Sequence, residues 1–411
     1  MGNENDFTNP FRPGAGHQPP YLAGRVQETQ EFQKLLRQKT ILENMVLTGL
    51  RGVGKTVLLD KFKPIAMKEG WLWVGTDLSE SASLSEEKIA IRLLTDLSVV
   101  TSSVIIKKEE ITKIGFMQDS EIIDYTLNFN TLMNIYTNTP GLFADKIKYL
   151  LEFVWNGIAR THPKGLIFAY DEAQNLSDHA AKDEYPLSVL LDIFQSIQKK
   201  NIPFMLLFTG LPTLFPKLVE ARTYAERMFR VVFLNRLNLQ ESKDAILKPI
   251  EDAKCQITLS AESVETITKL SSGYPYFIQF ICREVYDAFV QRANKGEKLI
   301  VPTIEIMRKL DTDFFSGRWS RATDRQRTLL YIIAKLENCD NEFSVQEVSD
   351  LSKKIAMKSF SSSHVNQMLL SLTNAGIVYK NRYGKYSFAV PLLGQFILRQ
   401  EIADIKPESE K

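Results

Sequence analysis

The chain has 411 residues, of which 44% are hydrophobic, and a formal net charge of +2 at pH 7. This length and apolar content predict two or three globular domains with sizeable cores. The near-neutral balance excludes binding to nucleic acid or a membrane through overall charge, so any basic surface must be local.

Cysteine usage and hydrophobicity bear on the compartment. The three widely spaced cysteines are not a disulfide framework and are typical of reduced thiols inside a cell. No apolar run approaches the roughly 20 residues of a membrane span, and residues 1–20 are not a hydrophobic signal segment. We therefore expect a cytoplasmic protein with no membrane partner.

The first part of the chain alternates between strand and helix patterns. It begins with a Pro- and Gly-rich arm at 1–20 and a helical pattern at 27–39. The longest helical stretch fills 82–160, with a weakly defined middle near 100–130. Strands separated by helices predict an α/β fold with a parallel sheet and helices on both faces. The predicted strands are residues 44–49, 71–79, 165–174, 202–210 and 231–237.

The glycine-rich stretch TGLRGVGKT (48–56) joins the first strand to the next helix. Its spacing Gly49-x4-Gly54-Lys55-Thr56 is the P-loop pattern, in which glycines let backbone N–H groups face a phosphate. Lys55 would contact the β- and γ-phosphates and Thr56 would ligate Mg²⁺. The alternative is a plain glycine-rich turn. We predict that ATP and Mg²⁺ bind here, through Gly49, Arg51, Gly52, Val53, Gly54, Lys55, Thr56 and Val57.

A second acidic motif follows a later strand. GLIFAYDEAQ (165–174) is an apolar strand followed by Asp171 and Glu172, at the C-terminal end where α/β sheets bind ligands. Asp171 would hold Mg²⁺ and Glu172 would polarise the attacking water, so we expect hydrolysis as well as binding. The alternative for two adjacent carboxylates is a solvated loop or a helix N-terminus.

With these motifs, residues 8–290 resemble the AAA+ superfamily, specifically its archaeal-type and signal-transducing (STAND) branch, with kinship to origin-recognition ATPases. The resemblance also rests on PPYLAGRVQE (19–28), FMLLFTGLPTL (204–214) and SSGYPYFIQFICREV (271–285). It implies that Thr209 is a polar sensor and that Pro275 opens a lid helix. It further implies that the first of these stretches wraps the adenine, through Tyr21, Leu22, Gly24 and Arg25.

The positions of the arginines near the expected site differ from those in many members of this family. Many members carry a sensor arginine where this chain has Tyr274 and Tyr276, and this departure favours the STAND branch over a ring-type remodelling motor. Related ATPases place an arginine just before the last strand, where Arg227 is the best match and Arg230 the alternative. Such an arginine acts on the γ-phosphate of a neighbouring subunit and implies self-assembly. The alternative is a surface salt bridge with a nearby glutamate.

Residues 316–411 predict a winged helix. Three helical patterns are followed by an alternating stretch at 376–389 around Tyr383-Gly384, which predicts a hairpin. The third helix of a helix-turn-helix fold enters the major groove of DNA. We predict DNA contacts from this helix and the hairpin, at Ser362, His364, Asn366, Lys380, Arg382 and Lys385. The alternative is a module that binds a separate effector protein.

These inferences divide the chain into an extended arm (1–20), a P-loop AAA+ ATPase domain (21–240), a helical lid (241–315) and a winged-helix domain (316–411). We expect an ATP-hydrolysing molecular switch associated with DNA, in a replication, mobile-element or defence setting. The alternative function is a STAND-like regulatory ATPase whose winged helix binds an effector protein instead of DNA.

Overall fold

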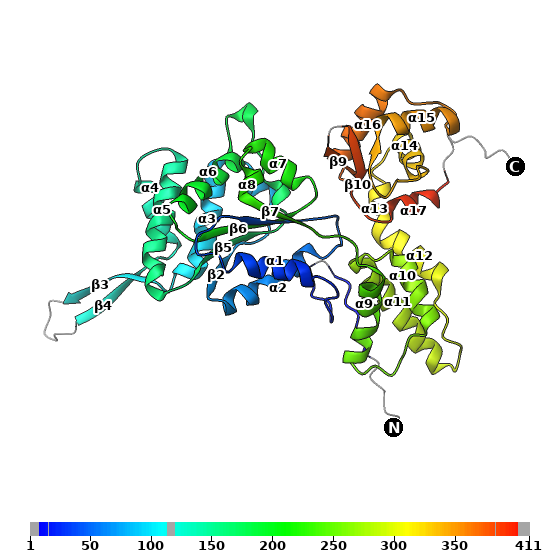
Figure 1. Cartoon of the computed structure of the whole chain (residues 1–411), viewed down its shortest axis with the longest axis horizontal. Coiled ribbons are helices and arrows are strands. Elements are labelled where there is room, and N and C mark those ends of the chain that lie inside the picture. The colour runs from blue at the N-terminus through cyan, green and yellow to red at the C-terminus, as the bar shows by residue number, and fades with distance from the viewer. Residues whose placement is uncertain (1–7, 15, 113–119, 383, 402–411) are drawn as a thin grey trace. The chain divides into compact units, whose positions relative to one another are not determined.

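The computed structural model describes residues 8–14, 16–112, 120–382 and 384–401, without the side chains of 106–112, 120–125 and 382. The chain forms two compact units (Figure 1). The sheet unit consists of Arg25–Thr48 and Leu58–Phe233, and the helical unit consists of Met1–Gly24, Gly49–Val57 and Leu234–Lys411. Within the described ranges, no helix is both long enough and apolar enough to cross a membrane.

The sheet unit is built on five parallel strands: β1 (Asn44–Thr48), β2 (Trp71–Val74), β5 (Gly165–Tyr170), β6 (Phe204–Gly210) and β7 (Phe229–Phe233). Their order across the sheet is β2-β5-β6-β1-β7. Every residue of β1, β5 and β6 is buried, as a parallel sheet covered on both faces requires. The predicted α/β fold with a parallel sheet is therefore confirmed.

Helices cover both faces of this sheet. They are α1 (Val26–Leu35), α2 (Lys55–Lys68), α3 (Glu86–Thr101), α4 (Phe129–Asn138), α5 (Phe143–Ile158), α6 (Pro186–Lys199), α7 (Leu214–Ala221) and α8 (Ala225–Met228). Phe168 of β5 and Phe208 of β6 share one apolar cluster with α3, α5 and α6. On the other face, Phe32 of α1 and Phe62 of α2 stack with ring centroids 4.2 Å apart. Figure 1 shows α1 and α2 across the sheet from α6 and α7.

The structure corrects the expected helical stretch at 82–160. Between α3 and α4 the chain forms an antiparallel hairpin of β3 (Ile105–Thr112) and β4 (Ser120–Thr126). Isoleucine and threonine recur in these strands, and β-branched side chains favour strands over helices. The run of charged residues at 107–110 hid this preference in the sequence. The last strand of the sheet also begins and ends earlier than the predicted 231–237.

The helical unit begins with four longer helices: α9 (Leu239–Asp252), α10 (Ala261–Ser271), α11 (Pro275–Asn294) and α12 (Thr303–Leu310). A π-helical turn, η5 (Asp311–Phe315), and α13 (Ser316–Trp319) continue the chain toward the C-terminal region. Pro275 stands in the first turn of α11, where a missing N–H costs no hydrogen bond.

The C-terminal region has three helices and a small sheet. The helices are α14 (Asp324–Ala334), α15 (Val345–Ile355) and α16 (Ser362–Asn374), and α17 (Leu393–Leu398) follows the sheet. The strands β8 (Phe343–Ser344), β9 (Val378–Arg382) and β10 (Lys385–Phe388) pair antiparallel in the order β8-β10-β9. The hairpin predicted at 376–389 is confirmed, and its predicted turn residue Tyr383 lies outside the described residues.

A fully buried asparagine ties the sheet unit together at the start of β1. The Asn44 Oδ1 atom accepts hydrogen bonds from the backbone N–H of Leu206 and from the Gln198 side chain, both at 2.8 Å. Its Nδ2 atom donates to the carbonyl oxygen of Met228 at 3.2 Å. One side chain therefore holds β1 to β6, to α6 and to the residue before β7.

Asn44→Ala should destabilise the sheet unit without touching the expected site. The change leaves the Leu206 N–H and the Met228 carbonyl oxygen buried without the Asn44 hydrogen bond, at about 1–3 kcal/mol each, whereas Gln198 keeps its bond to the Phe204 carbonyl oxygen. We expect the free energy of unfolding, measured by urea denaturation, to fall by about 3 kcal/mol or more. The exposed Lys199→Ala on α6 is the control and should stay within about 0.5 kcal/mol of the wild type. Equal denaturation midpoints for the two variants would contradict the role of Asn44.

Candidate functional site

The predicted P-loop links β1 to α2 and belongs to the helical unit. Gly52 and Gly54 adopt φ values of 78° and 90°, which side chains strongly disfavour. At Gly49 a Cβ atom would lie 2.6 Å from the carbonyl oxygen of Leu234, so only glycine fits. The backbone conformation of the loop therefore requires its glycines, as a phosphate-binding loop would.

Lys55 is the first residue of α2, and its side chain is 8% exposed. Its ammonium group donates hydrogen bonds to the carbonyl oxygens of Gly49 and Leu50, both at 3.0 Å. The charge is thus held on the loop itself and does not extend into solvent. Thr56 follows in the same helical turn, where backbone N–H groups and the helix dipole favour an anion.

The N-terminal arm lies beside this loop and has no helix or strand in its described residues. Asn9 donates to the carbonyl oxygen of Arg283 at 3.0 Å and to the Asp287 carboxylate at 2.7 Å, which fixes the arm to α11. Further along, the Gln18 side chain donates to the carbonyl oxygen of Val57 at 2.9 Å. The arm therefore connects α11 with the first turn of α2.

The residues predicted to wrap the adenine lie where the arm ends. Tyr21 and Leu22 are half-buried, and the Tyr21 hydroxyl accepts a hydrogen bond from Lys248 of α9 at 3.0 Å. Gly24 has a φ of 64°. Arg25 begins the sheet unit, is buried, and pairs with Glu28 at 3.2 Å. The adenine contact itself stays a prediction for all four.

In the sheet unit, the predicted metal ligand Asp171 and the predicted sensor Thr209 are joined by a hydrogen bond. Asp171 follows β5 and is buried, and Thr209 lies near the end of the adjacent β6. The Thr209 hydroxyl donates to Oδ1 of Asp171, and the backbone N–H of Glu172 donates to the same oxygen at 2.7 Å. These donors fix the carboxylate of Asp171 at the C-terminal edge of the sheet.

Glu172 is held in an unfavourable backbone conformation. Its φ of 49° lies in the left-handed region, which costs a non-glycine residue free energy and is concentrated at functional sites. Its carboxylate accepts a hydrogen bond from Gln174, whose side-chain oxygen accepts from the backbone N–H of Leu211 at 3.1 Å. Gln174, the last residue of the DEAQ motif, thus links Glu172 to the loop after β6.

Two further carboxylates gather near Asp171 that the sequence analysis did not select. Burial and the charge of Asp171 raise the pKa of Asp60 on α2. Burial and the charges of Asp171 and Glu172 raise the pKa of Asp77, whose backbone bridges to Asp171. Both could have been identified from the sequence. Asp60 lies four residues after Thr56 and therefore on the same face of α2, and Asp77 comes shortly after the end of the strand β2. These carboxylates oppose one another's ionisation at this edge of the sheet.

Arg227 lies at the opposite edge of the sheet from Asp171. It is exposed on α8, which immediately precedes β7, whereas Asp171 and Thr209 lie at strand ends. In a parallel sheet these two edges are about 15 Å apart for strands of this length. Within the described part of the chain, Arg227 forms no ion pair with a glutamate, whereas Arg230 pairs with Glu31 and Glu43.

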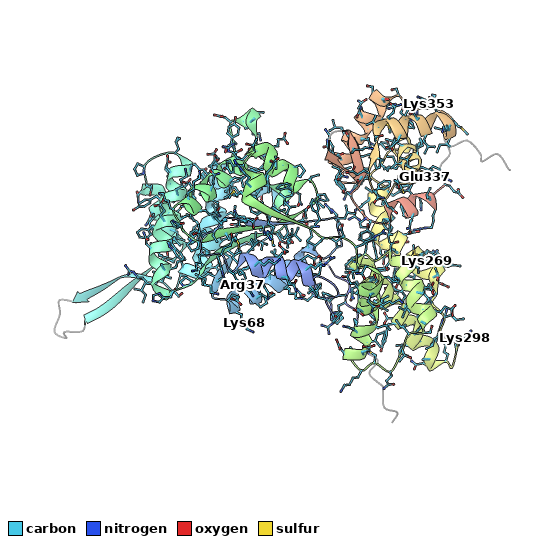
Figure 2. All side chains as sticks on the ribbon, viewed as in Figure 1. Arg37, Lys68, Lys269, Lys298, Glu337 and Lys353 are labelled. Carbon is cyan, nitrogen blue, oxygen red and sulfur yellow. The ribbon has the colours of Figure 1, made fainter. Side chains whose placement is uncertain are left out.

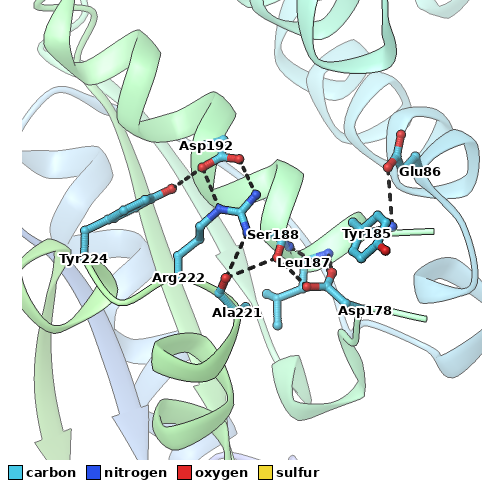
Figure 3. Close-up of polar contacts among 9 residues, drawn as sticks. All are labelled: Glu86, Asp178, Tyr185, Leu187, Ser188, Asp192, Ala221, Arg222 and Tyr224. Carbon is cyan, nitrogen blue, oxygen red and sulfur yellow. Dashed lines mark hydrogen bonds and ion pairs between the residues drawn. The ribbon is translucent and has the colours of Figure 1, made fainter. Parts of the chain in front are cut away.

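A network of polar contacts fixes the segment that carries Arg227 (Figure 3). Arg222 donates to both oxygens of Asp192 on α6, at 2.9 and 2.6 Å, and the Tyr224 hydroxyl donates to the same carboxylate at 2.6 Å. Burial opposes ionisation of Asp192, but these hydrogen bonds hold its pKa below the usual range. The segment before α8 is therefore anchored, and Arg227 projects from a fixed base.

In the C-terminal region, the predicted DNA-contacting residues lie on α16 and the hairpin. His364 and Asn366 are exposed on α16, Ser362 is half-buried, and Ser361 caps the helix by accepting from the N–H of His364. Lys380 is exposed on β9, and Lys385 pairs with Glu347 at 3.6 Å. The side chain of Arg382 lies outside the described residues.

Comparison with known sequences matches only the C-terminal part of the chain to a family model. The sequence matches no curated protein. Residues 312–397 match the model of a domain of unknown function, DUF8462.

Three solved structures are similar to the chain in fold at low sequence identity. The Aeropyrum pernix ORC1 protein in complex with DNA is 15% identical, with coverage of 92% of this chain and 93% of that chain and a TM-score of 0.46. The Aeropyrum pernix ORC2 protein, in ADPNP-ADP complexes, is 13% identical, with coverage of 96% and 97% and a TM-score of 0.49. AMPPCP-bound DnaA from Aquifex aeolicus is 11% identical, with coverage of 86% and 90% and a TM-score of 0.38.

Proposed function

We propose that this chain binds ATP with Mg²⁺, hydrolyses it, and acts as a DNA-associated molecular switch of the AAA+ type. The P-loop is the observation that carries the proposal. Its glycines are required by positive φ values and a close backbone approach, and its lysine is buried with the ammonium group on the loop. A glycine-rich turn without a ligand has no need for a buried lysine charge.

The residues of the loop suit a triphosphate. Backbone N–H groups of the loop and of the first turn of α2 offer donors to the phosphate oxygens, and Lys55 adds a full positive charge. When ATP binds, its phosphates would replace the carbonyl oxygens of Gly49 and Leu50 as partners of Lys55. The stretch 19–28, at the end of the arm that is fixed to Val57 and α11, is the segment we assign to the adenine.

The donor set also suits Mg²⁺, which prefers oxygen ligands and is usually held by one or two carboxylates together with substrate phosphates. The Thr56 hydroxyl and the Asp171 carboxylate would hold the ion, which would neutralise charge that develops on the phosphates. Among the described residues there is no group of three or more side chains able to form a metal site without a substrate. Asp60 and Asp77 lie near Asp171, and burial together with its charge raises their pKa values.

Glu172 is the residue we assign to activate water. A base must be held in place before the reaction, and the left-handed backbone together with the Gln174 hydrogen bond holds this carboxylate beside Asp171. Asp171 is already engaged by the Thr209 hydroxyl and the Glu172 N–H, so its role is to bind and not to accept a proton.

Lys55→Ala and Glu172→Gln should separate binding from hydrolysis. Lys55→Ala removes the main charge on the loop and should abolish tight ATP binding. Glu172→Gln keeps Asp171 and should bind ATP normally but hydrolyse it roughly 100-fold more slowly. Calorimetric titration and phosphate release measure the two effects.

The exposed Glu220→Gln is the matched control for the charge change and should turn over like the wild type. Unchanged turnover of Glu172→Gln would show that another residue is the base. Retention of wild-type ATP affinity in Lys55→Ala would refute the P-loop assignment.

We assign Arg227 to the nucleotide of a neighbouring subunit. Because Arg227 and Asp171 lie at opposite edges of one sheet, the arginine is too far to act on a nucleotide next to Asp171 of its own chain. It is exposed and stands on an anchored segment, which an arginine acting on a partner needs. Arg230 is a weaker candidate because two glutamates already neutralise it.

Arg227→Ala should leave ATP affinity intact and lower turnover. It should also remove any rise of specific activity with protein concentration, which phosphate-release assays over a dilution series measure. A mixture with Lys55→Ala should regain some activity, because one mixed interface pairs an intact loop with an intact arginine. Turnover per molecule that is independent of concentration, together with normal turnover of Arg227→Ala and Arg230→Ala, would eliminate the trans assignment.

The proposed DNA association rests on the C-terminal region, which we assign as a winged helix. Three helices followed by an antiparallel hairpin have the order of that fold, and the exposed face of α16 presents hydrogen-bonding side chains. The alternative is a surface for a protein effector, and the ion pair of Lys385 with Glu347 favours it because this pair reduces the positive charge next to the hairpin.

Full-length His364→Ala/Asn366→Ala and Lys380→Ala should distinguish these partners. The double variant should bind duplex DNA more weakly, by about 1–3 kcal/mol for each base that it no longer recognises, and Lys380→Ala should reduce the slope of log affinity against log salt by about 1. Fluorescence anisotropy at several salt concentrations measures both. The control is Lys298→Ala, an exposed lysine beyond α11 that points outward in Figure 2. Wild-type DNA affinity in both variants would favour the effector alternative.

A further inference from the structure

The apex of the P-loop is in contact with the start of α11. The backbone N–H of Tyr276 donates to the carbonyl oxygen of Gly52 at 3.2 Å. A Cβ atom on Gly52 would lie 3.1 Å from the Cβ atom of Tyr276. The loop and the first turn of α11 are therefore packed against each other within the helical unit.

An aromatic stack extends this contact to the segment that leads into the C-terminal region. The ring centroids of Tyr276 and Phe314 are 5.2 Å apart, and Phe314 belongs to the π-helical turn η5. The guanidinium of Arg318 lies 4.9 Å from the Phe314 ring centroid, and Arg318 also donates to the Phe314 carbonyl oxygen at 2.8 Å. π-helical turns occur frequently at functional sites.

Two other arginines act on the charge of Arg318. Burial, then the charge of Arg51 on the P-loop, then that of Arg321 lower the pKa of Arg318. In the part of the chain that the structure describes, the Arg51, Arg318 and Arg321 side chains make no ion pair with a carboxylate. Arg318 is half-buried, whereas Arg51 and Arg321 are exposed. A half-buried arginine beside other arginines gains from a bound anion, because the anion offsets the repulsion and accepts its hydrogen bonds.

We propose that Arg318, together with Arg51, binds the phosphate groups of the nucleotide held on the P-loop. The inference rests on the proposed function and deepens it, since it adds a nucleotide contact from outside the sheet, the loop and α11. The phosphates of a nucleoside triphosphate are the anion that the loop itself selects. The backbone of Gly52, one residue from Arg51, is the point to which the Tyr276–Phe314–Arg318 stack is attached.

The consequence is a direct connection between nucleotide and C-terminal region. Arg318 of α13 belongs to the matched segment 312–397, and Phe315, the last residue of η5 just before α13, stacks on Phe396 of α17 with centroids 5.1 Å apart. A phosphate that draws Arg318 toward the loop therefore acts on the element that packs against α17.

The test measures ATP and ADP affinity of full-length Arg318→Met by calorimetric titration. Methionine keeps an apolar stem against Phe314 and removes the charge. We expect ATP to bind about tenfold more weakly or worse, as when a hydrogen bond to a charged group is removed, with a smaller effect for the less charged ADP. Without nucleotide, the melting temperature of Arg318→Met should equal or exceed that of the wild type, because the repulsion from Arg51 is gone.

Arg325→Met is the matched control, because Arg325 also stacks on a phenylalanine, with its guanidinium 3.8 Å from the Phe360 ring centroid. It should bind ATP with wild-type affinity. Arg51→Met is a second variant that leaves the Phe314 stack untouched, and it should also weaken ATP binding severalfold. Its result keeps the proposal testable if Arg318→Met does not fold.

The outcomes separate this inference from the proposed function. If the wild type binds ATP, Lys55→Ala does not, and both Arg318→Met and Arg51→Met bind it like the wild type, the inference is overturned and the P-loop assignment stands. If both variants keep ATP affinity but lose affinity for duplex DNA, the arginines bind DNA phosphates and the inference is also overturned. If the wild type itself does not bind ATP, the proposed function fails and the inference fails with it.

Discussion

All five strands of the sheet run in one direction, and this constraint decides where the functional side chains of the sheet unit lie. Strand ends meet at one edge, which brings Asp171 and Thr209 within hydrogen-bonding distance although 38 positions separate them in the sequence. Strand starts meet at the other edge, which is where Arg227 stands. A single sheet thus carries the carboxylate that we assign to Mg²⁺ at one edge and the arginine that we assign to a neighbouring subunit at the other.

The parallel arrangement also explains the buried polar groups of this unit. A sheet covered on both faces cannot leave backbone or side-chain polar groups to water. At the start of β1, the Asn44 side chain forms hydrogen bonds with β6, with α6 and with the residue before β7. At the opposite edge, the Asp171 carboxylate accepts hydrogen bonds from the Thr209 hydroxyl and the Glu172 N–H, which fix its position.

Unfavourable features are concentrated at the residues we assign to nucleotide chemistry. Lys55 is buried, Glu172 has a left-handed backbone, and Asp77 is near two other carboxylates. In the helical unit, Arg318 also carries its charge in an unfavourable place, because burial and the charge of Arg51 lower its pKa. Each feature costs folding free energy, and a bound phosphate or cation would relieve the cost of those that involve a side-chain charge. Their coincidence in residues of one proposed function is more informative than any one of them.

Local features of the site could be predicted from the amino-acid sequence alone. Gly49, Gly54, Lys55 and the strand before Asp171 are short stretches, and backbone conformation and hydrophobic periodicity are properties that a short stretch reveals. The hairpin at 105–126 was missed because its charged residues obscured a weak strand preference, which the pairing of β3 with β4 decides.

Contacts between distant segments required the folded chain. They include the bond of Gln174 to the loop after β6, the approach of Asp77 to Asp171, and the stack from Gly52 to Arg318. Side-chain charge and packing act through space, between residues whose separation in the chain carries no signal of their proximity. The sequence therefore predicted the loop and the acidic strand, and the tertiary structure alone placed the groups that surround them.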